Sequence, residues 1–389
     1  MPDIAARLNN LPPYPFAVLN QRVRELNNAG FDIVNLDIGS PDMPPSDLVI
    51  KSMTDAISDP TAHGYSGYKG TAEFRAGVAR YYERRFGVIL DPEKNVLPLL
   101  GSKEGIVNLS LAFLDQGDIA LVPEIAYPAY QMGAHLAGAQ VQWVKLDVAN
   151  GFLPDLDALA ADFPKRAKLL WINYPNNPTG ATCDFSTYQK IVDFCRERNL
   201  LLASDNPYVE VTFDGYVAGS VLQVAGALDT TVEFISWSKS YNMAGWRLGA
   251  AVGSAEALKT LLVVKSNMDS GHFHAIYKAG ITASDETPRS WIDARNLIYE
   301  KRRDKILAAL PDMGLVAKKT SGSLYVWART EMGNGSQFAE AALTQAHVSV
   351  APGVIYGPGG TPYIRMSLGI PDDRLDEALS RLKSWYGKR

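Results

Sequence analysis

The sequence predicts an α/β protein in which a mostly parallel β-sheet forms a large domain and a smaller α+β domain completes the chain. Three observations lead to this prediction. The chain has 389 residues, too many for one ordinary hydrophobic core, which favours about two domains. From about residue 70 to 280, short runs apolar on both faces alternate with helical patterns, as in a buried parallel sheet. After residue 285, one long charged helix precedes separate strands.

The N-terminal segment is predicted to be irregular at first and regular from about residue 21. Residues 11–16, LPPYPF, are rich in proline and are expected to form an arm on the surface. Residues 21–28 are typical of a short helix. Residues 32–38, DIVNLDI, alternate as a strand does and end in Gly-Ser-Pro-Asp.

The middle of the chain supplies the expected sheet. Strands are predicted at residues 96–100, 119–123, 168–173, 200–204 and 232–236. Helices are predicted between them, for example at residues 103–114 and 187–198. A strand followed each time by a helix is the pattern of a parallel sheet.

The C-terminal part has a different pattern. Residues 291–310 are typical of one long, highly charged helix, and strands are predicted at 322–329 and 363–367. We therefore expect an N-terminal arm with part of the small domain at 1–44, a large domain at 45–285 and the small domain at 286–389.

Composition excludes several classes of partner. Lys plus Arg number 38 against 42 Asp plus Glu, so the net charge of -4 gives no general attraction for nucleic acid or an anionic membrane. The start shows no secretory signal, and no apolar run approaches the roughly 20 residues that span a bilayer. Cys183 and Cys195 are too few for a disulfide framework and favour a reducing compartment. A cytoplasmic protein is expected.

Polar side chains follow four of the predicted strands at their carboxyl ends, where parallel sheets bind ligands. They are Gly101 with Ser102, Asn177, Asp205 with Tyr208, and Ser238 with Lys239. Each alone has an ordinary explanation, such as a helix cap, a turn or a solvated lysine. An acid, an amide, a phenol and a lysine on one rim, beside a candidate phosphate cup at a helix start, indicate a common ligand.

These residues belong to a series of motifs that together resemble a known family. In chain order they are IGSPD at residues 38–42, YSGYKG at 65–70 followed by EFR, GSKEG, PEIAYPAY, NYPNNPTG, SDNPY, SWSKSYNMAGWRLG, SNMDSG, APG with YGPGG, and PYIRMSLG. With this series the chain resembles the fold-type I enzymes of pyridoxal 5′-phosphate (PLP), specifically the class I and II aminotransferases related to aspartate aminotransferase. The segment around Lys239 is the most specific. The resemblance implies a seven-stranded sheet flanked by helices in the large domain.

The resemblance also implies roles around the cofactor ring. Lys239 would hold PLP as a Schiff base, the internal aldimine, and serve as the catalytic base. Asp205 would lie beside the pyridine nitrogen and keep it protonated, because a carboxylate favours the charged form. Tyr208 and Asn177 would bond the 3-oxygen of the ring, and Tyr127 would stack on its face.

The phosphate and the substrate have their own implied residues. Gly101, Ser102 and Lys103 would form the phosphate cup at a helix N-terminus, and Ser238 and Arg247 would close it. Tyr65 and Ser270 would reach the phosphate of a neighbouring subunit, which implies a homodimer with shared sites. Arg365 would grip the substrate α-carboxylate with a planar fork, assisted by Gly39 and Asn177.

The predicted activity is transfer of an amino group between an L-amino acid and a 2-oxo acid by ping-pong chemistry, with glutamate and 2-oxoglutarate expected as one pair. A PLP lyase or synthase, of β-C–S lyase or aminocyclopropane-carboxylate synthase type, shares all these cofactor residues and remains an alternative. A transcription factor with an aminotransferase-like domain is disfavoured, since the motifs begin by Leu11. No metal is expected, because His272 and His274 lack a third ligand nearby.

Substrate choice is the open part of the prediction. LPPYPF and GSKEG resemble the subgroup that contains LL-diaminopimelate, alanine and aspartate aminotransferases. Lys103 could face the phosphate or reach the distal carboxylate of a dicarboxylic substrate, and the sequence favours neither.

Overall fold

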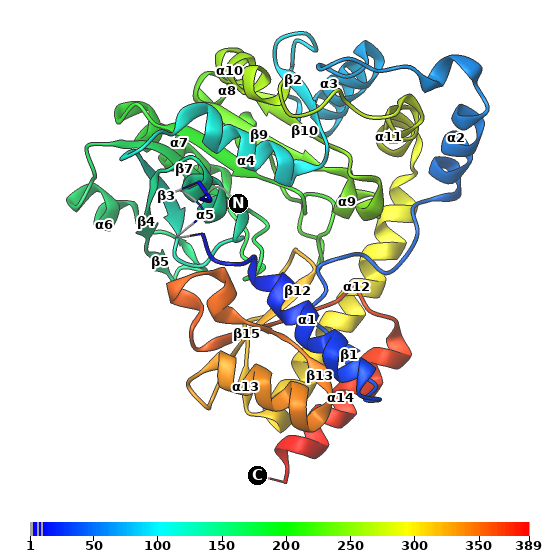
Figure 1. The fold of residues 1–389 in the computed structure, drawn as a ribbon, viewed down its shortest axis with the longest axis vertical. Coiled ribbons are helices and arrows are strands. Elements are labelled where there is room, and N and C mark those ends of the chain that lie inside the picture. Colours follow the sequence, from blue (N-terminus) through cyan, green and yellow to red (C-terminus); the bar gives the residue numbers. More distant parts are fainter. Residues whose placement is uncertain (1–2, 6–7, 9–10, 389) are drawn as a thin grey trace.

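The structure is a computed structural model that describes residues 3–5, 8 and 11–388. Figure 1 shows a broad upper part built on the large sheet and a lower part that contains both the N-terminal helix α1 and the C-terminal helix α14. The strands are β1 Val34–Asn35, β2 Val96–Leu99, β3 Ile119–Pro123, β4 Gln140–Val144, β5 Leu146–Asp147, β6 Leu153–Pro154, β7 Ala167–Ile172, β8 Leu201–Asp205, β9 Thr231–Ser236, β10 Gly249–Gly253, β11 Leu315–Val316, β12 Tyr325–Thr330, β13 Val348–Ser349, β14 Ala351–Pro352 and β15 Tyr363–Ser367. The α-helices are α1 Pro15–Asn28, α2 Asp47–Ile57, α3 Ala72–Phe86, α4 Ser102–Phe113, α5 Ala129–Leu136, α6 Leu156–Ala161, α7 Phe185–Glu197, α8 Ala227–Thr230, α9 Trp237–Ser240, α10 Ala255–Lys265, α11 His274–Glu286, α12 Arg289–Ala309, α13 Gly335–Ala341 and α14 Asp372–Tyr386.

The large sheet confirms the predicted fold class. Within the described residues it has seven strands in the order β2-β10-β9-β8-β7-β3-β4, and β10 alone runs antiparallel to its neighbours. Helices α3, α7 and α11 pack on one face, and α4, α5 and α10 pack on the other. Successive side chains of one strand enter opposite cores, since Leu170 joins the first cluster and Trp171 the second. Because all the strands of this sheet except β10 run in the same direction, their polar carboxyl ends meet at one edge.

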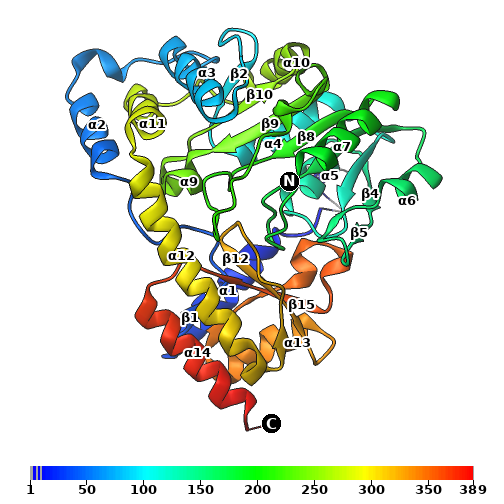
Figure 2. The same ribbon diagram turned by 180° about the vertical axis from the view of Figure 1, so that it is seen from behind.

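The lower part is built on a four-stranded antiparallel sheet of order β11-β12-β15-β14. Strand β1 pairs in parallel with β13, with Val34 opposite Val348, and so attaches the N-terminal segment to this part. Figure 2 shows α12 running from beside α11 in the upper part down to α14. The predicted boundary at residue 285 falls in the last turn of α11, and the domain limits remain a prediction.

Several predicted elements need correction. Helix α1 begins at Pro15 rather than residue 21, because proline is well tolerated at the first helical position. Residues 11–14 are irregular with Pro12 and Pro13 exposed, as expected of an arm, but Tyr14 and Phe16 also line a cavity. The expected strand at 32–38 is reduced to the two residues of β1. Over the described ranges, no helix is long and apolar enough to cross a membrane.

Candidate active site

A cavity of about 300 Å³ opens at the carboxyl edge of the large sheet, where the lower part of the molecule meets it. Its lining comes from strand ends, helix starts and both sheets. The lining residues are Tyr14, Phe16, Ile38, Gly39, Ser40, Ser102, Lys103, Tyr127, Asn177, Asp205, Pro207, Tyr208, Ser236, Ser238, Lys239, Arg247, Tyr325 and Arg365. The cavity thus collects side chains from segments more than 300 positions apart.

Lys239 lies in the short helix α9 at the end of β9. The Ser236 hydroxyl accepts the main-chain N–H of Ser238 at 3.2 Å, which turns the chain out of the strand into this helix. The Lys239 side chain is half-buried, and its ammonium donates to the carbonyl of Gly39. Burial lowers the pKa of Lys239 from 10.5 to about 7, and the nearby charges of Arg365 and Arg247 act in the same direction. A lysine with this pKa supplies a neutral amine near neutral pH.

Asp205 ends strand β8 and is 4% exposed. The hydroxyl of Tyr130 donates to its Oδ2 at 2.8 Å, while no side chain or main chain of the described residues donates to Oδ1. Burial raises the pKa of Asp205 from 3.8 to about 7, the bond from Tyr130 lowers it, and Glu233 raises it further. A buried carboxylate oxygen without a donor fits a ligand that brings an N–H group of its own.

Asn177, Arg365 and Tyr208 form one connected group. The Arg365 guanidinium donates to Asn177 Oδ1 at 3.1 Å and to the carbonyl of Asp37 at 2.5 Å. It stacks 3.9 Å from the ring centroid of Tyr325, whose hydroxyl lies 3.0 Å from that of Tyr208. Among the described residues nothing accepts from Arg365 Nε, which leaves a donor free for an anion.

The other end of the cavity is suited to an anion. Helix α4 begins at Ser102, so its first N–H groups lack helical acceptors and face outward. Gly101 precedes it with φ +81°, and a Cβ there would lie 2.5 Å from Arg247 Nη2. Ser238 lines the same cavity. Main-chain N–H groups, a guanidinium and a hydroxyl are the donors that phosphate groups bind.

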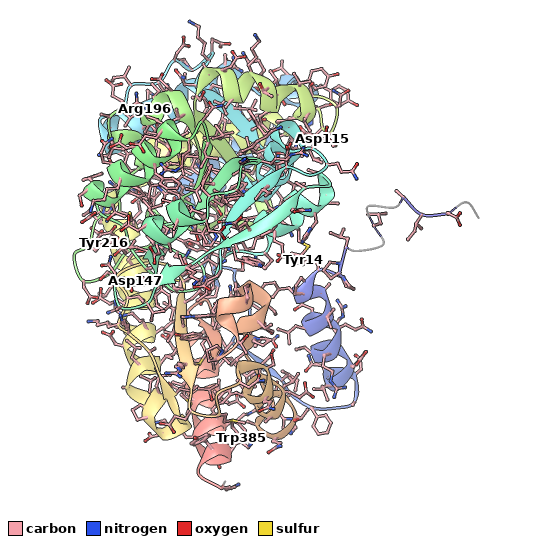
Figure 3. The ribbon with its side chains drawn as sticks, turned by 90° about the vertical axis from the view of Figure 1, so that its left-hand side faces the viewer. Tyr14, Asp115, Asp147, Arg196, Tyr216 and Trp385 are labelled. Atoms are coloured by element: carbon pink, nitrogen blue, oxygen red, sulfur yellow. The ribbon has the colours of Figure 1, made fainter. Side chains whose placement is uncertain are left out.

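Lys103 lines the cavity next to Tyr14. Its ammonium is 3.7 Å from the ring centroid of Tyr14, a cation–π contact. The Tyr14 hydroxyl donates to Tyr127 at 3.5 Å. Figure 3 places Tyr14 at the upper end of α1, at the level where the two parts of the molecule meet.

The structure brings most of the predicted site residues together. The cavity is lined by Gly39, Ser102, Lys103, Tyr127, Asn177, Asp205, Tyr208, Ser238, Lys239, Arg247 and Arg365. Gly101 packs directly against the guanidinium of Arg247. Tyr65, which is 93% exposed, and Ser270 do not line this cavity. In the part of the chain that is described, no three His, Cys, Asp or Glu side chains are grouped to hold a metal ion.

Sequence reasoning missed residues that support the site. Asn173 donates to the carbonyl of Asp205 at 2.6 Å and accepts the N–H of Asn177 at 2.7 Å, so it fixes the two strand ends together. Tyr130 donates to Asp205 from the first turn of α5, and nothing in the PEIAYPAY motif singled it out. Tyr325 also had no signal, since a tyrosine in an apolar strand resembles any core residue.

The fold and this cavity define a PLP-binding enzyme of the α/β class: a lysine, an acid and an anion cup lie at the strand ends of a mostly parallel sheet. The chain belongs to the class I and II aminotransferases, whose family model matches residues 32–382. It is a PLP-dependent aminotransferase, which confirms the predicted transaminase activity.

Known relatives cover nearly the whole chain. The LL-diaminopimelate aminotransferase of Moorella thermoacetica is 44% identical over 385 residues, covering 99% of this chain and 98% of the relative. The apo form of BacF from Bacillus subtilis has a TM-score of 0.95 at 32% identity and covers 99% of each chain. A probable N-succinyldiaminopimelate aminotransferase from Thermus thermophilus has a TM-score of 0.89 at 36% identity, over 95% of this chain and 99% of its own.

Proposed function

We propose that this aminotransferase takes its amino group from a dicarboxylic amino acid of the LL-diaminopimelate type and passes it to 2-oxoglutarate. The observation that carries the proposal is the number of cations in the cavity. Arg247 suits the cofactor phosphate and Arg365 suits the substrate α-carboxylate, which leaves the ammonium of Lys103 for a third anion. The name of the Moorella relative supports the same choice of donor.

The cavity residues fit PLP. Asp205 Oδ1 has a vacant acceptor position for a protonated ring nitrogen, and such a cation would favour the ionised carboxylate, lowering a pKa that burial raises to about 7. Tyr208 and Asn177 would bond the ring oxygen, Tyr127 would stack on the ring, and Lys239 would attach to the aldehyde carbon. When bound, PLP supplies an electron sink for the electron pair left after the substrate Cα loses a proton.

The phosphate would lie at the start of α4. Gly101 and Ser102 would donate through main-chain N–H groups, and Ser238 and Arg247 would donate through their side chains. Lys103 would not take part, because its ammonium is engaged with the Tyr14 ring rather than with this cup.

Arg365 and Lys239 would act on the substrate. The free Nε of Arg365 gives its guanidinium room for a carboxylate while Nη1 remains bonded to Asn177, and Gly39 lets the main chain approach the same carboxylate. The Lys239 amine, whose pKa is lowered to about 7 so that a substantial fraction is neutral near pH 7, can accept the Cα proton at Nζ and deliver it to the cofactor side. The Gly39 carbonyl holds this amine in the cavity beforehand.

We also propose a homodimer with shared sites. Tyr65 projects into solvent in the isolated chain, and Ser270 lies in the neighbouring loop, since Gly271 packs against Ser66. An exposed tyrosine and serine outside their own cavity are placed to reach the partner's phosphate cup. Provided that Tyr65→Ala is inactive alone, mixing it with Lys239→Ala should restore part of the activity after subunit exchange. Exchange without any recovery would contradict shared sites.

The cytoplasm is the proposed location. Cys183 and Cys195 are both buried free thiols, as expected in a reducing compartment. A fractionation of cells that express the full gene product would test this proposal, and recovery from an oxidising compartment would contradict it.

The test of the substrate proposal is a donor screen. LL-diaminopimelate, L-glutamate, L-aspartate and L-alanine are each mixed with the PLP enzyme without an oxo-acid acceptor, and the rate at which the bound cofactor loses its visible absorbance is measured against donor concentration. The highest kcat/KM is expected for LL-diaminopimelate. Lys103→Met should lower kcat/KM for dicarboxylic donors, spare L-alanine and leave PLP affinity unchanged. A loss of PLP affinity instead would assign Lys103 to the phosphate.

A further inference from the structure

Helix α12 carries three buried arginines. Arg295, Arg302 and Arg303 are 3%, 5% and 0% exposed, although the helix is highly charged and crosses between the two parts of the molecule. Burying a guanidinium is costly unless its donors are used. The partners of these three side chains therefore indicate what each one does.

Arg295 is bonded to the main chain that carries the lysine. Its Nη1 donates to the carbonyl of Ser240 at 2.5 Å and to the carbonyl of Lys239 at 3.1 Å. Its Nη2 donates to the carbonyl of Glu210 at 2.5 Å. The carbonyls of Lys239 and Ser240 lie at the C-terminal end of the four-residue helix α9, which has too few residues to satisfy them internally, and Glu210 lies in the segment after β8.

Among the described residues Arg295 makes no ion pair with a carboxylate, although its neighbours on the helix do. Asn296 Oδ1 accepts from its Nε at 3.2 Å, so its near partners are neutral oxygens. Burial lowers the pKa of Arg295 to about 10. A buried cation without a carboxylate contributes little to stability, so holding carbonyls in place is its more evident effect.

Arg302 is bonded to the segment that touches the lysine amine. Its Nη1 donates to Oδ1 and Oδ2 of Asp42, each at 2.9 Å, and to the carbonyl of Leu368 at 3.1 Å. Asp42 is three residues after Gly39, whose carbonyl accepts from Lys239. Leu368 follows the strand that carries Arg365.

The geometry points to α12 as a rigid spacer that fixes the position of Lys239 relative to Arg365. Seven residues separate Arg295 from Arg302, which is nearly two turns on one face and about 10 Å of axis. Arg295 fixes the main chain of Lys239, and Arg302 fixes both the residue 39–42 segment and the end of the Arg365 strand. Both are positioning residues that set the lysine amine against the substrate carboxylate. This inference rests on the proposed role of Lys239.

Arg303 provides a matched control. It lies on the same helix and is fully buried, but its Nη1 donates to Asp214 and to the carbonyl of Thr320, each at 2.6 Å. It has no bond to Lys239 or to residues 39–42 in the described structure. The three variants Arg295→Lys, Arg302→Lys and Arg303→Lys each keep the charge and lose the planar fork.

The experiment measures cofactor absorbance against pH together with kcat and KM. Arg295→Lys should move the pH midpoint of the bound cofactor's absorbance by at least about 0.5 and lower kcat about tenfold or more, because small misplacements of a reacting group are costly. Arg302→Lys should raise the KM for the amino acid about tenfold, since one fork is lost. Arg303→Lys should change the thermal midpoint while leaving these quantities within about twofold.

If Arg295→Lys has the same pH midpoint of cofactor absorbance, the same kcat and the same KM as Arg303→Lys, the positioning role is refuted. If Arg295→Lys does not fold, Asn296→Ala frees part of the guanidinium and should give a smaller shift of the same sign, and no shift there would also refute the role. Borohydride reduction of the wild type separates the two claims. Label on a lysine other than Lys239 refutes the proposed role of Lys239, whereas label on Lys239 with unshifted variants refutes only the spacer.

Discussion

Asp205→Asn should stabilise the apoenzyme, and increasingly so as the pH rises toward 7. The pKa of Asp205 is raised from 3.8 to about 7, chiefly by burial. Between these two values the folded protein binds a proton that the unfolded chain releases, so stability falls as pH rises through this window. A pKa difference of about 3 corresponds to about 4 kcal/mol at full effect, and to about 3 kcal/mol between about pH 5 and pH 8. Asparagine has no charge to desolvate and avoids this cost.

The expected effect is measurable as a thermal midpoint. At about 2.1 cal/mol/K per residue, a chain of 389 residues changes its midpoint by about 1.2 °C per kcal/mol. The gain of Asp205→Asn over wild type should therefore be about 3–4 °C larger at about pH 8 than at about pH 5, by differential scanning fluorimetry of apoenzyme. With PLP bound and substrate present, the variant should lose at least about a hundredfold in kcat.

A control of opposite sign is available. Lys168, at 2.6 Å, lowers the pKa of Asp118 to about 2, so Asp118→Asn should destabilise the protein above about pH 4. If Asp205→Asn is no more stable than wild type at pH 8, or if its gain does not grow with pH, burial does not govern the charge of Asp205 and the reasoning is wrong.

Three further predictions follow from the same cavity. Lys239→Met should stabilise apoenzyme most below about pH 7 and progressively less up to pH 10.5, because the folded pKa is lowered to about 7 and the unfolded chain binds the extra proton; a gain that grows with pH would contradict it. Arg365→Lys should raise the KM for amino acids at least about tenfold with PLP affinity unchanged, in steady-state kinetics and fluorescence titration. Gly101→Ala should weaken PLP about tenfold in the same titration, because a Cβ at φ +81° meets Arg247 at 2.5 Å; unchanged affinity would exclude a tight cup.

The sheet was predictable where its strands are apolar on both faces. Strands β3 and β9 lie within a residue of their predicted limits for this reason. Strand β10, GAAVG, was missed because glycine and alanine have low strand propensity. Its small residues are required by close packing, since a Cβ on Gly253 would lie 2.1 Å from the Thr231 carbonyl. Strand β4 was missed because it is an edge strand with polar positions, such as Gln140.

The cavity was predictable as a set of residues but not as a network. Parallel strands bring their ends to one edge, so Asn177, Asp205 and Lys239 could be grouped from the sequence. The contact of Lys103 with Tyr14 joins positions 89 apart, through a segment that its prolines made look irregular. Neither strand ends nor helix periodicity predicts such a contact, which depends on how the lower part packs against the sheet.

The same burial acts in opposite directions on the two titratable groups at the centre of the cavity. It raises the pKa of Asp205 and lowers that of Lys239, because a low-dielectric site disfavours charge of either sign. Each shift costs the apoenzyme stability. The lowered pKa gives Lys239 more of the neutral amine that its proposed role needs, whereas Asp205 needs a cationic partner to stay ionised in its proposed role. A cationic ring nitrogen would supply Asp205 with the partner that the folded chain leaves out. At this edge of the sheet, the burial that makes these side chains reactive therefore lowers the stability of the apoenzyme. Cofactor binding is expected to restore part of the lost free energy of unfolding.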